Sequence, residues 1–252
     1  MPLYEAVYER LDVGGGTRML GLGCGSGLAL LMAASRGAAV TGVDSGSPER
    51  LALARQRLLP EAPEARDARA RADARIVEGV PRDARDPAAP AFTLVTAFEP
   101  IGCLAGDSEG LGGLLAEATP LAARGAAVVL AGWGPPERCA TTSVLRVATK
   151  LADPLRSPGS WRPALRDDLE EVAHRAGLAP DGSGRVACPF GYADVDSAVR
   201  GLLSTGLFDA AIAATDQEQV DKELAEALHP HRRPDGTVWM PNVFRYLVAR
   251  TR

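Results

Sequence analysis

Apolar residues in the first half of the chain follow two alternating patterns. Short continuous apolar runs, such as "GTRMLGL" and "AVTGVD", are typical of buried strands, and longer segments between them have helical patterns. The pattern predicts strands at residues 16–22, 39–44, 74–80, 92–98 and 125–133, and helices at 4–11, 28–38, 47–59 and 110–123. Regular alternation of this kind predicts a mostly parallel sheet with helices on both faces.

Local signals mark the ends of two of these helices. Ser47 is a suitable N-cap, and Pro48 occupies the first helical position. A further amphipathic segment begins at residue 166, and Gly177 lies just past its end. We therefore expect one helix to begin at Pro48 and another to end before Gly177.

The second half of the chain is less regular. We expect a helix and a loop at 135–160, strands at 184–190 and 242–250, and two helices between them at 195–203 and 216–228. We interpret the two helices as an insertion that caps the edge of the sheet. The whole chain, 1–252, is then a single domain, with its core at about 12–133, 166–190 and 240–252 and its cap elements at about 134–165 and 191–239.

Composition and charge argue against several classes of partner and site. Of the 252 residues, 46% are hydrophobic and 24% are charged, which is typical of a globular protein. The net charge of −4 argues against a nucleic-acid partner, because such proteins usually carry a basic stripe. We find no signal-peptide pattern and no run long enough to cross a membrane. Cys24, Cys103, Cys139 and Cys188 form no C-x-x-C pair, so we expect no metal site and a reduced, soluble, cytoplasmic protein.

The stretch "MLGLGCGSGLALL" places glycine at four alternate positions between a predicted strand and a predicted helix. Glycines at such a turn let the backbone approach a ligand closely, and the helix N-terminus favours polar or anionic groups. The spacing does not fit the dinucleotide fingerprint, and no Gly-Lys-Ser/Thr follows, which excludes a P-loop. Asp44, at the end of the next strand, is able to accept hydrogen bonds from both hydroxyls of a ribose.

The stretch "LGLGCGSG", followed by "VTGVDSGSPERLALAR", resembles the first two motifs of class I S-adenosylmethionine (SAM)-dependent methyltransferases. The strands "FTLVTAF" and "GAAVVLAGWG" resemble later core motifs, so the match covers about residues 17–133. The helix "RDDLEEVAHRAGL" and the strand "FRYLVA" agree with the rest of that fold. The resemblance implies a doubly wound α/β fold of Rossmann-like type, whose seven-stranded sheet has one antiparallel strand, with the helical cap inserted before the last strand.

The resemblance also implies SAM as the cofactor. It assigns the glycine loop to the methionine part, the end of the second strand to the ribose and adenine, and the loops after the third and fourth strands to further contacts. The implied cofactor-binding residues are Gly21, Leu22, Gly23, Cys24, Gly25, Asp44, Ser45, Gly46, Asp83, Ala84, Ala97 and Phe98.

Methyl transfer to a small molecule is the leading function, and we hypothesise a phenolic or polyketide-like secondary metabolite as the acceptor. The family usually has an acid in place of Gly21 and an Asp in place of Thr93. These departures favour an alternative, a related protein repurposed for cyclisation or rearrangement, with SAM retained structurally or lost. A non-catalytic binding subunit is a third hypothesis.

Few residues precede the glycine loop, so a partner chain in a homodimer could complete the cover of the cofactor.

Methyl transfer requires a base only when the acceptor must lose a proton. Glu99 follows the fourth strand at the ligand-binding edge, where it could orient or deprotonate the acceptor. The alternatives are a solvated acid of the loop or a contact to the amine of the cofactor. His229 and His231, in "LHPHRRPDG", are the other candidate bases. Aromatic residues of the second half could form a wall for a planar acceptor, and those we predict to bind it are Trp133, Trp161, Tyr192 and Trp239, with Phe190 and Phe244 nearby.

Overall fold

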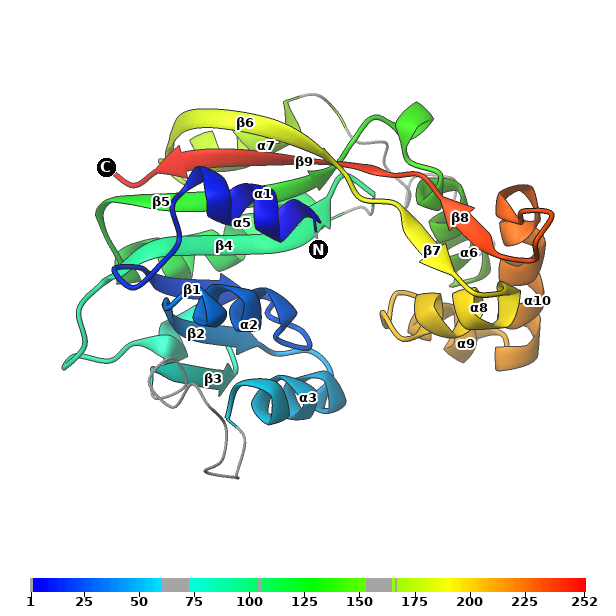
Figure 1. Ribbon diagram of the computed structural model, residues 1–252, viewed down its shortest axis with the longest axis horizontal. Helices are drawn as coiled ribbons and strands as arrows, with labels where there is room; N and C mark the ends of the chain where they lie inside the picture. Colours follow the sequence, from blue (N-terminus) through cyan, green and yellow to red (C-terminus); the bar gives the residue numbers. More distant parts are fainter. Residues whose placement is uncertain (1, 60–72, 104–105, 153–164, 166) are drawn as a thin grey trace.

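The computed structural model describes residues 2–59, 73–103, 106–152, 165 and 167–252. Its main sheet consists of β1 (Arg18–Leu22), β2 (Ala39–Asp44), β3 (Ala74–Glu78), β4 (Phe92–Ile101), β5 (Ala122–Trp133), β6 (Ala179–Ala187) and β9 (Val243–Arg250). The strand order is β3-β2-β1-β4-β5-β9-β6 (Figure 1). β9 is antiparallel to both of its neighbours, whereas the other pairs are parallel. This confirms the predicted seven-stranded sheet with one antiparallel strand.

Helices cover both faces of this sheet. They are α1 (Pro2–Arg10), α2 (Leu28–Ser35) and α3 (Pro48–Leu58) on one face, and α5 (Asp107–Ala118) and α7 (Asp168–Arg175) on the other (Figure 1). Successive strand residues point to opposite faces. Met19 therefore joins the apolar cluster on the side of α1 and α2, and Leu20 joins the cluster on the side of α5 and α7. A strand buried in this way needs the continuous apolar run that the sequence shows.

The predicted helix signals are confirmed. The Ser47 hydroxyl accepts a hydrogen bond from the Arg50 amide at 3.4 Å, and Pro48 begins α3. Gly177 follows α7 in a left-handed conformation with φ of 70°.

Several predicted boundaries were wrong, and proline accounts for two of the differences. The predicted helix at 110–123 already ends at Ala118, and β5 begins at Ala122, because Pro120 stands in the short 3-10 turn between them. The predicted strand at 184–190 is two strands, β6 and β7 (Phe190–Tyr192). Pro189 lies between them and has no amide to donate to a ladder.

The cap lies beyond the carboxyl ends of the parallel strands (Figure 1). β7 and β8 (Val238–Met240) pair as a two-stranded antiparallel sheet that continues from β6 and β9. The cap helices are α6 (Thr141–Ala152), α8 (Val195–Leu203), α9 (Asp209–Ala214) and α10 (Gln217–Leu228). The prediction of two helices between the last two strands therefore missed α9 and the small sheet. An element as short as α9 or β7 carries too few apolar positions to show a period.

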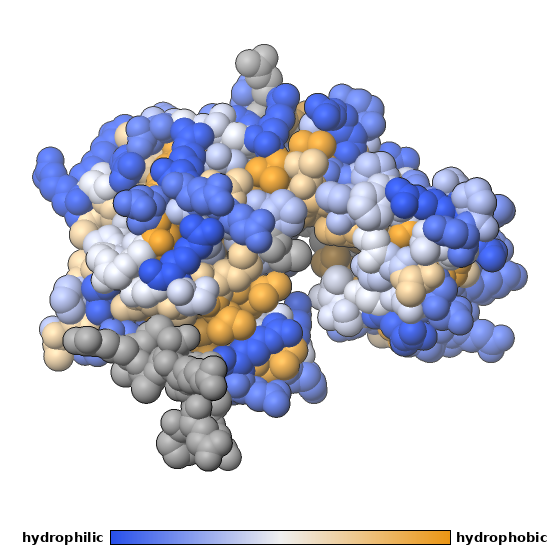
Figure 2. All heavy atoms as spheres, viewed as in Figure 1, coloured by the Kyte–Doolittle hydropathy of each residue, from blue (hydrophilic) through white to orange (hydrophobic). Residues whose placement is uncertain are grey.

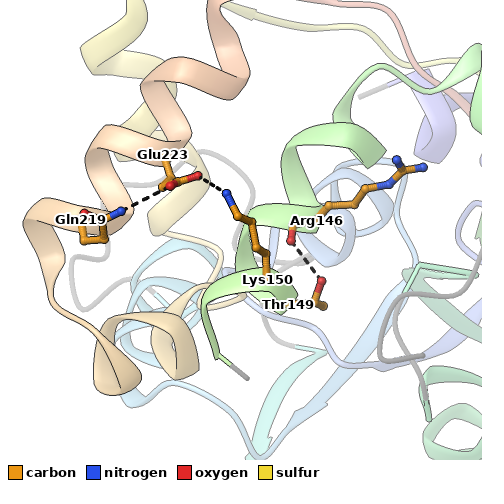
Figure 3. Close-up of polar contacts among 5 residues, drawn as sticks. All are labelled: Arg146, Thr149, Lys150, Gln219 and Glu223. Atoms are coloured by element: carbon orange, nitrogen blue, oxygen red, sulfur yellow. Dashed lines mark hydrogen bonds and ion pairs between the residues drawn. The ribbon is translucent and has the colours of Figure 1, made fainter. Parts of the chain in front are cut away.

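Polar contacts hold the cap together and join it to the core. Lys150 of α6 donates a hydrogen bond to Glu223 of α10 at 2.8 Å, while Arg146 extends from α6 away from Glu223 (Figure 3). At the joint, the buried Asn242 side chain accepts from the Thr141 amide at 3.0 Å and donates to the Thr141 hydroxyl at 2.8 Å. These bonds fix the start of α6 against the segment that leads from β8 into β9.

Candidate functional site

The glycine loop joins β1 to α2 at the carboxyl edge of the sheet. Gly23, Gly25 and Gly27 have φ values of 59°, 50° and 75°, a left-handed backbone that strongly favours glycine. A Cβ atom on Gly27 would also lie 2.9 Å from the Cβ of Ala54, so α3 packs directly on the loop. Alternate glycines are therefore needed both for the turn and for close packing, and the backbone of the turn is left bare.

Asp44, the last residue of β2, faces this loop. Its Oδ2 accepts a hydrogen bond from the Gly25 amide at 2.7 Å, and its Oδ1 accepts one from the Gly46 amide at 2.7 Å. An ionised carboxylate offers about four acceptor positions, so about two remain for other donors. The carboxylate is thus oriented between two loops, with capacity for a pair of vicinal hydroxyls.

Arg57, in the last turn of α3, hydrogen-bonds to Ser26 of the glycine loop. Its Nη1 donates to both the carbonyl oxygen and the hydroxyl of Ser26, each at 2.8 Å. The neighbouring Arg55 points elsewhere and pairs with Glu78 of β3 at 3.3 Å. Sequence reasoning missed Arg57, because the contact joins residues 31 positions apart and no local motif marks it.

An irregularity at the end of β4 places the Glu99 side chain beside the glycine loop. Ala97 pairs with Leu130 of β5, but the next pair is Ile101 with Gly132, so β4 carries two extra residues. Bulges of this kind re-aim side chains next to functional sites. The Oε2 of Glu99, which lies in the bulge, is 3.4 Å from the position that a Cβ atom on Gly23 would occupy. The structure therefore brings Glu99 and the glycine loop together, as the sequence predicted for this edge.

Helix α1 covers the same end of the site. The Tyr4 and Phe98 rings lie 4.7 Å apart between centroids, and the Tyr8 and Phe98 rings lie 5.9 Å apart. The Tyr8 hydroxyl donates to the carbonyl of Ala29 in the first turn of α2 at 2.8 Å. Burial raises the pKa of Tyr4, so its hydroxyl stays protonated and able to donate. Sequence reasoning missed Tyr4, because only the packing of α1 places it beside Phe98.

Comparison with solved structures identifies the architecture. Geranyl diphosphate C-methyltransferase of Streptomyces coelicolor A3(2) is 15% identical, with a TM-score of 0.53 over 99% of this chain and 78% of that chain. Magnesium protoporphyrin IX methyltransferase of Synechocystis PCC 6803 is 13% identical, with a TM-score of 0.51 over 97% and 79%. The chain has the class I methyltransferase fold. This confirms the resemblance seen in the sequence at the level of the fold.

A cyclase, SpnF, shares the methyltransferase fold as well. It is 18% identical to this chain, with a TM-score of 0.54 over 99% of this chain and 80% of that chain. No family model matches the sequence, and no curated protein is significantly similar to it. The fold is therefore established by structure alone, and the chemistry has to be argued from the site.

The remaining predicted cofactor residues divide into loop and core positions. Ser45 and Gly46 are exposed beside Asp44. The side chains of Leu22 and Ala97 are buried in the apolar cluster on the side of α5 and α7, so only their backbone is available to a ligand. At these two positions the edge therefore presents backbone and not side chains.

Asp83 and Ala84 lie in the short helical turn η1 (Pro81–Ala84) after β3. The Asp83 carboxylate accepts a hydrogen bond from the Val80 amide at 2.9 Å, and Ala84 is buried against α5. The Asp83 carboxylate is thus turned toward its own loop. No hydrogen bond among the described residues joins it to the glycine loop or to the Asp44 side chain.

Class I methyltransferases usually have an acid at the position of Gly21. In this chain, packing explains why the residue is glycine. A Cβ atom on Gly21 would lie 2.9 Å from Cδ2 of Leu30, which is fully buried. Gly21 pairs in register with Gly42 of β2, where a Cβ atom would overlap Leu30 and lie 2.9 Å from Sγ of Cys24. Leu30 fills the space above both glycines, which allows α2 to approach the sheet closely.

The predicted aromatic wall is only partly assembled. Trp133 lies 4.8 Å from Phe244 and 6.4 Å from Phe190 between ring centroids, where the sheet meets the cap. Tyr192 and Trp239 lie on opposite faces of the β7–β8 sheet, because Trp239 pairs with Gly191, one residue away from Tyr192. These two side chains therefore cannot form one wall.

Three predicted residues lie in the cap, and a fourth lies outside the described segments. His229 and His231 lie in the short turn η5 (His229–His231), which joins α10 to β8 of the cap (Figure 1). Burial lowers the pKa of His231, which favours its neutral form. Trp239 is 38% exposed and stacks with Arg233 at 4.6 Å. Trp161 lies outside the described residues.

A cavity of about 570 Å³ opens at the opposite edge of the sheet, at the amino ends of β1 to β4. Arg18 and Arg75 line it, but both guanidinium groups are already bound to backbone carbonyls. Ligands of doubly wound folds bind at the carboxyl ends of the strands, so a ligand is expected at the edge that holds Asp44 and not in this cavity.

Other classes of site are not seen in the part of the chain that the structure describes. No group of three or more His, Cys, Asp or Glu side chains there is arranged to hold a metal ion. None of the helices in those segments combines the length and apolar character needed to cross a bilayer. The four cysteines form no disulfide.

Proposed function

We propose that the protein transfers a methyl group from SAM to a small-molecule acceptor. The observation that carries the proposal is the Asp44 carboxylate, held by the Gly25 and Gly46 amides with acceptor capacity left for two hydroxyls. The left-handed glycine turn beside it leaves bare backbone for the amino-acid part of the cofactor. When bound, SAM supplies a methyl group that is already activated by its sulfonium.

Glu99 is the residue best placed to act on the acceptor. Its carboxylate lies beside Gly23, and among the described residues no hydrogen bond or ion pair joins it to another side chain or to the backbone. An acceptor hydroxyl or amine can therefore donate to Glu99, which orients the nucleophile and takes its proton as the methyl group is transferred. The nearby rings of Tyr4 and Phe98 favour a planar or apolar acceptor, which supports a phenolic or polyketide-like molecule.

A non-methylating reaction, cyclisation or rearrangement, is the second candidate. Leu30 occupies the space beside Gly21, so no acid is available there to balance a cationic cofactor. The cyclase SpnF has the same fold, although at 18% identity. The two candidates differ in one product, because only methyl transfer releases S-adenosylhomocysteine and adds a methylene unit to the acceptor mass.

Calorimetric titration with S-adenosylhomocysteine tests the proposal first. We expect micromolar binding by the wild-type protein and a loss of at least about tenfold in affinity in Asp44→Ala, since a charge-assisted contact is removed. Asp86→Ala is the matched control, because Asp86 lies on the loop at the opposite edge of the sheet. Absence of binding by the folded wild-type protein would overturn the proposal.

Incubation with SAM and a panel of phenols and polyketide-like compounds then separates the two candidates by mass spectrometry. A methylated product with S-adenosylhomocysteine supports methyl transfer. A rearranged product of unchanged mass, with SAM left intact, supports the second candidate.

A further inference from the structure

The cap and the glycine-loop half of the core face each other across a hollow in the surface (Figure 2). Arg50, in the first turn of α3, bridges them. Its Nη1 donates a hydrogen bond to the backbone carbonyl of Thr205 at 3.3 Å. Thr205 lies in the turn that joins α8 to α9, so a core side chain holds the backbone of the cap.

The same guanidinium lies against the loop that follows Asp44. Its Nη2 is 3.2 Å from the position that a Cβ atom would take on Gly46, whose amide donates to Asp44 Oδ1. It is also 3.8 Å from the corresponding position on Gly206 of the cap. Because glycine stands on both sides, the guanidinium fits between the two loops.

The charges on the two sides favour this placement. Asp44 Oδ1 is 2.9 Å from the Cβ position of Gly46, and Asp209 Oδ2 is 3.5 Å from the Cβ position of Gly206. Arg50 therefore lies between one carboxylate of the core and one carboxylate of the cap. A planar guanidinium with five donors is suited to span such a gap, whereas a hydrophobic side chain of similar length is not.

We propose that Arg50 is a positioning residue that couples occupation of the site beside Asp44 to the placement of the cap. The proposal rests on the proposed function, because the coupled ligand is the adenosine part of the cofactor. The hydrogen bond to Thr205 keeps the Arg50 guanidinium beside the 44–46 loop, where it can contact a bound ligand. A ligand that makes this contact therefore favours the arrangement in which Arg50 is bonded to the cap. By thermodynamic reciprocity, the bridge strengthens ligand binding by the same factor.

Hydrogen exchange at the 204–209 turn, followed by mass spectrometry, tests the bridge in the ligand-free protein. We expect the turn to exchange about three- to tenfold faster in Arg50→Met than in the wild type, and Arg50→Lys to lie between them. Arg55→Met is the matched control, because Arg55 lies on the same helix and pairs with β3, not with the cap. Equal exchange in the wild type and Arg50→Met, with both proteins folded by circular dichroism, would overturn the bridge.

Addition of S-adenosylhomocysteine tests the coupling. We expect it to slow exchange at 204–209 in the wild type and in Arg55→Met, and to leave the rate unchanged in Arg50→Met at saturating ligand. Equal slowing in the wild type and Arg50→Met would overturn the coupling alone. Failure of the wild type to bind the ligand would overturn both the coupling and the proposed function.

Discussion

Gly21 and Gly42 lie side by side in neighbouring parallel strands, and Leu30 fills the hollow that they leave. The absence of a side chain at both positions lets α2 approach the sheet closely. The departure of Gly21 from the usual family pattern is thereby explained by packing. It does not require that the ligand site has been lost.

A methyl group at Gly42 should destabilise the protein. Gly42→Ala places a Cβ atom in overlap with Leu30, and overpacking of a core costs about 1–3 kcal/mol. The free energy of unfolding from urea denaturation measures the effect. Gly112→Ala is the control, because a Cβ atom on this residue of α5 meets nothing within 4 Å and should stabilise the helix by about 0.5–1 kcal/mol. Equal stability of Gly42→Ala and the wild type would contradict the packing of Leu30.

Loss of the Arg57 side chain should loosen the glycine loop. Arg57→Met keeps the aliphatic stem but removes both hydrogen bonds to Ser26, so we expect the Kd for S-adenosylhomocysteine to rise about tenfold. Arg55→Met removes the exposed ion pair with Glu78 and no hydrogen bond to Ser26, and it should leave the Kd within about twofold. Calorimetry measures the Kd of both variants. An equal change in Kd would show that the contacts with Ser26 do not shape the site.

Glu99→Gln should reduce turnover while leaving cofactor binding intact. The amide keeps the shape of the side chain but cannot take a proton, and loss of a general base lowers kcat by about 10²–10⁴-fold. The rate with an identified acceptor and the Kd for S-adenosylhomocysteine are measured together. Glu109→Gln, a change at an exposed acid of α5, serves as the control. Near-normal kcat in Glu99→Gln would exclude the role of Glu99 as a base.

Alkaline pH should weaken the folded state through Cys24. Burial, with the Asp44 carboxylate nearby, raises the pKa of Cys24 to about 12, whereas the pKa of a thiol in an unfolded chain is about 8.5. Because the folded-state pKa is the higher one, this contribution to stability is complete below about pH 8.5 and is lost as the pH rises toward 12. Urea denaturation between pH 7 and pH 10 measures the decline. The prediction would be contradicted if the free energy of unfolding of Cys24→Ala fell with pH as steeply as that of the wild type.

The sequence by itself determined the class of the fold and predicted the position of the candidate site. Strand-helix alternation predicts the parallel sheet, because a strand buried on both faces must be apolar throughout. Alternate glycines and Asp44 predict the ligand edge, because only certain residues adopt the left-handed turn and because parallel strands end at one edge. Both signals are local, so both can be seen along the chain.

Only the tertiary structure decided which distant residues complete the site. Arg57 reaches Ser26, Arg50 reaches Thr205, and Tyr4 reaches Phe98, across separations that no local period records. The same holds for the aromatic residues, since the alternation of side chains in β7 and β8 sends Tyr192 and Trp239 to opposite faces. Contacts of this kind depend on how helices and cap pack on the sheet, and packing is a property of the whole fold, not of any one segment.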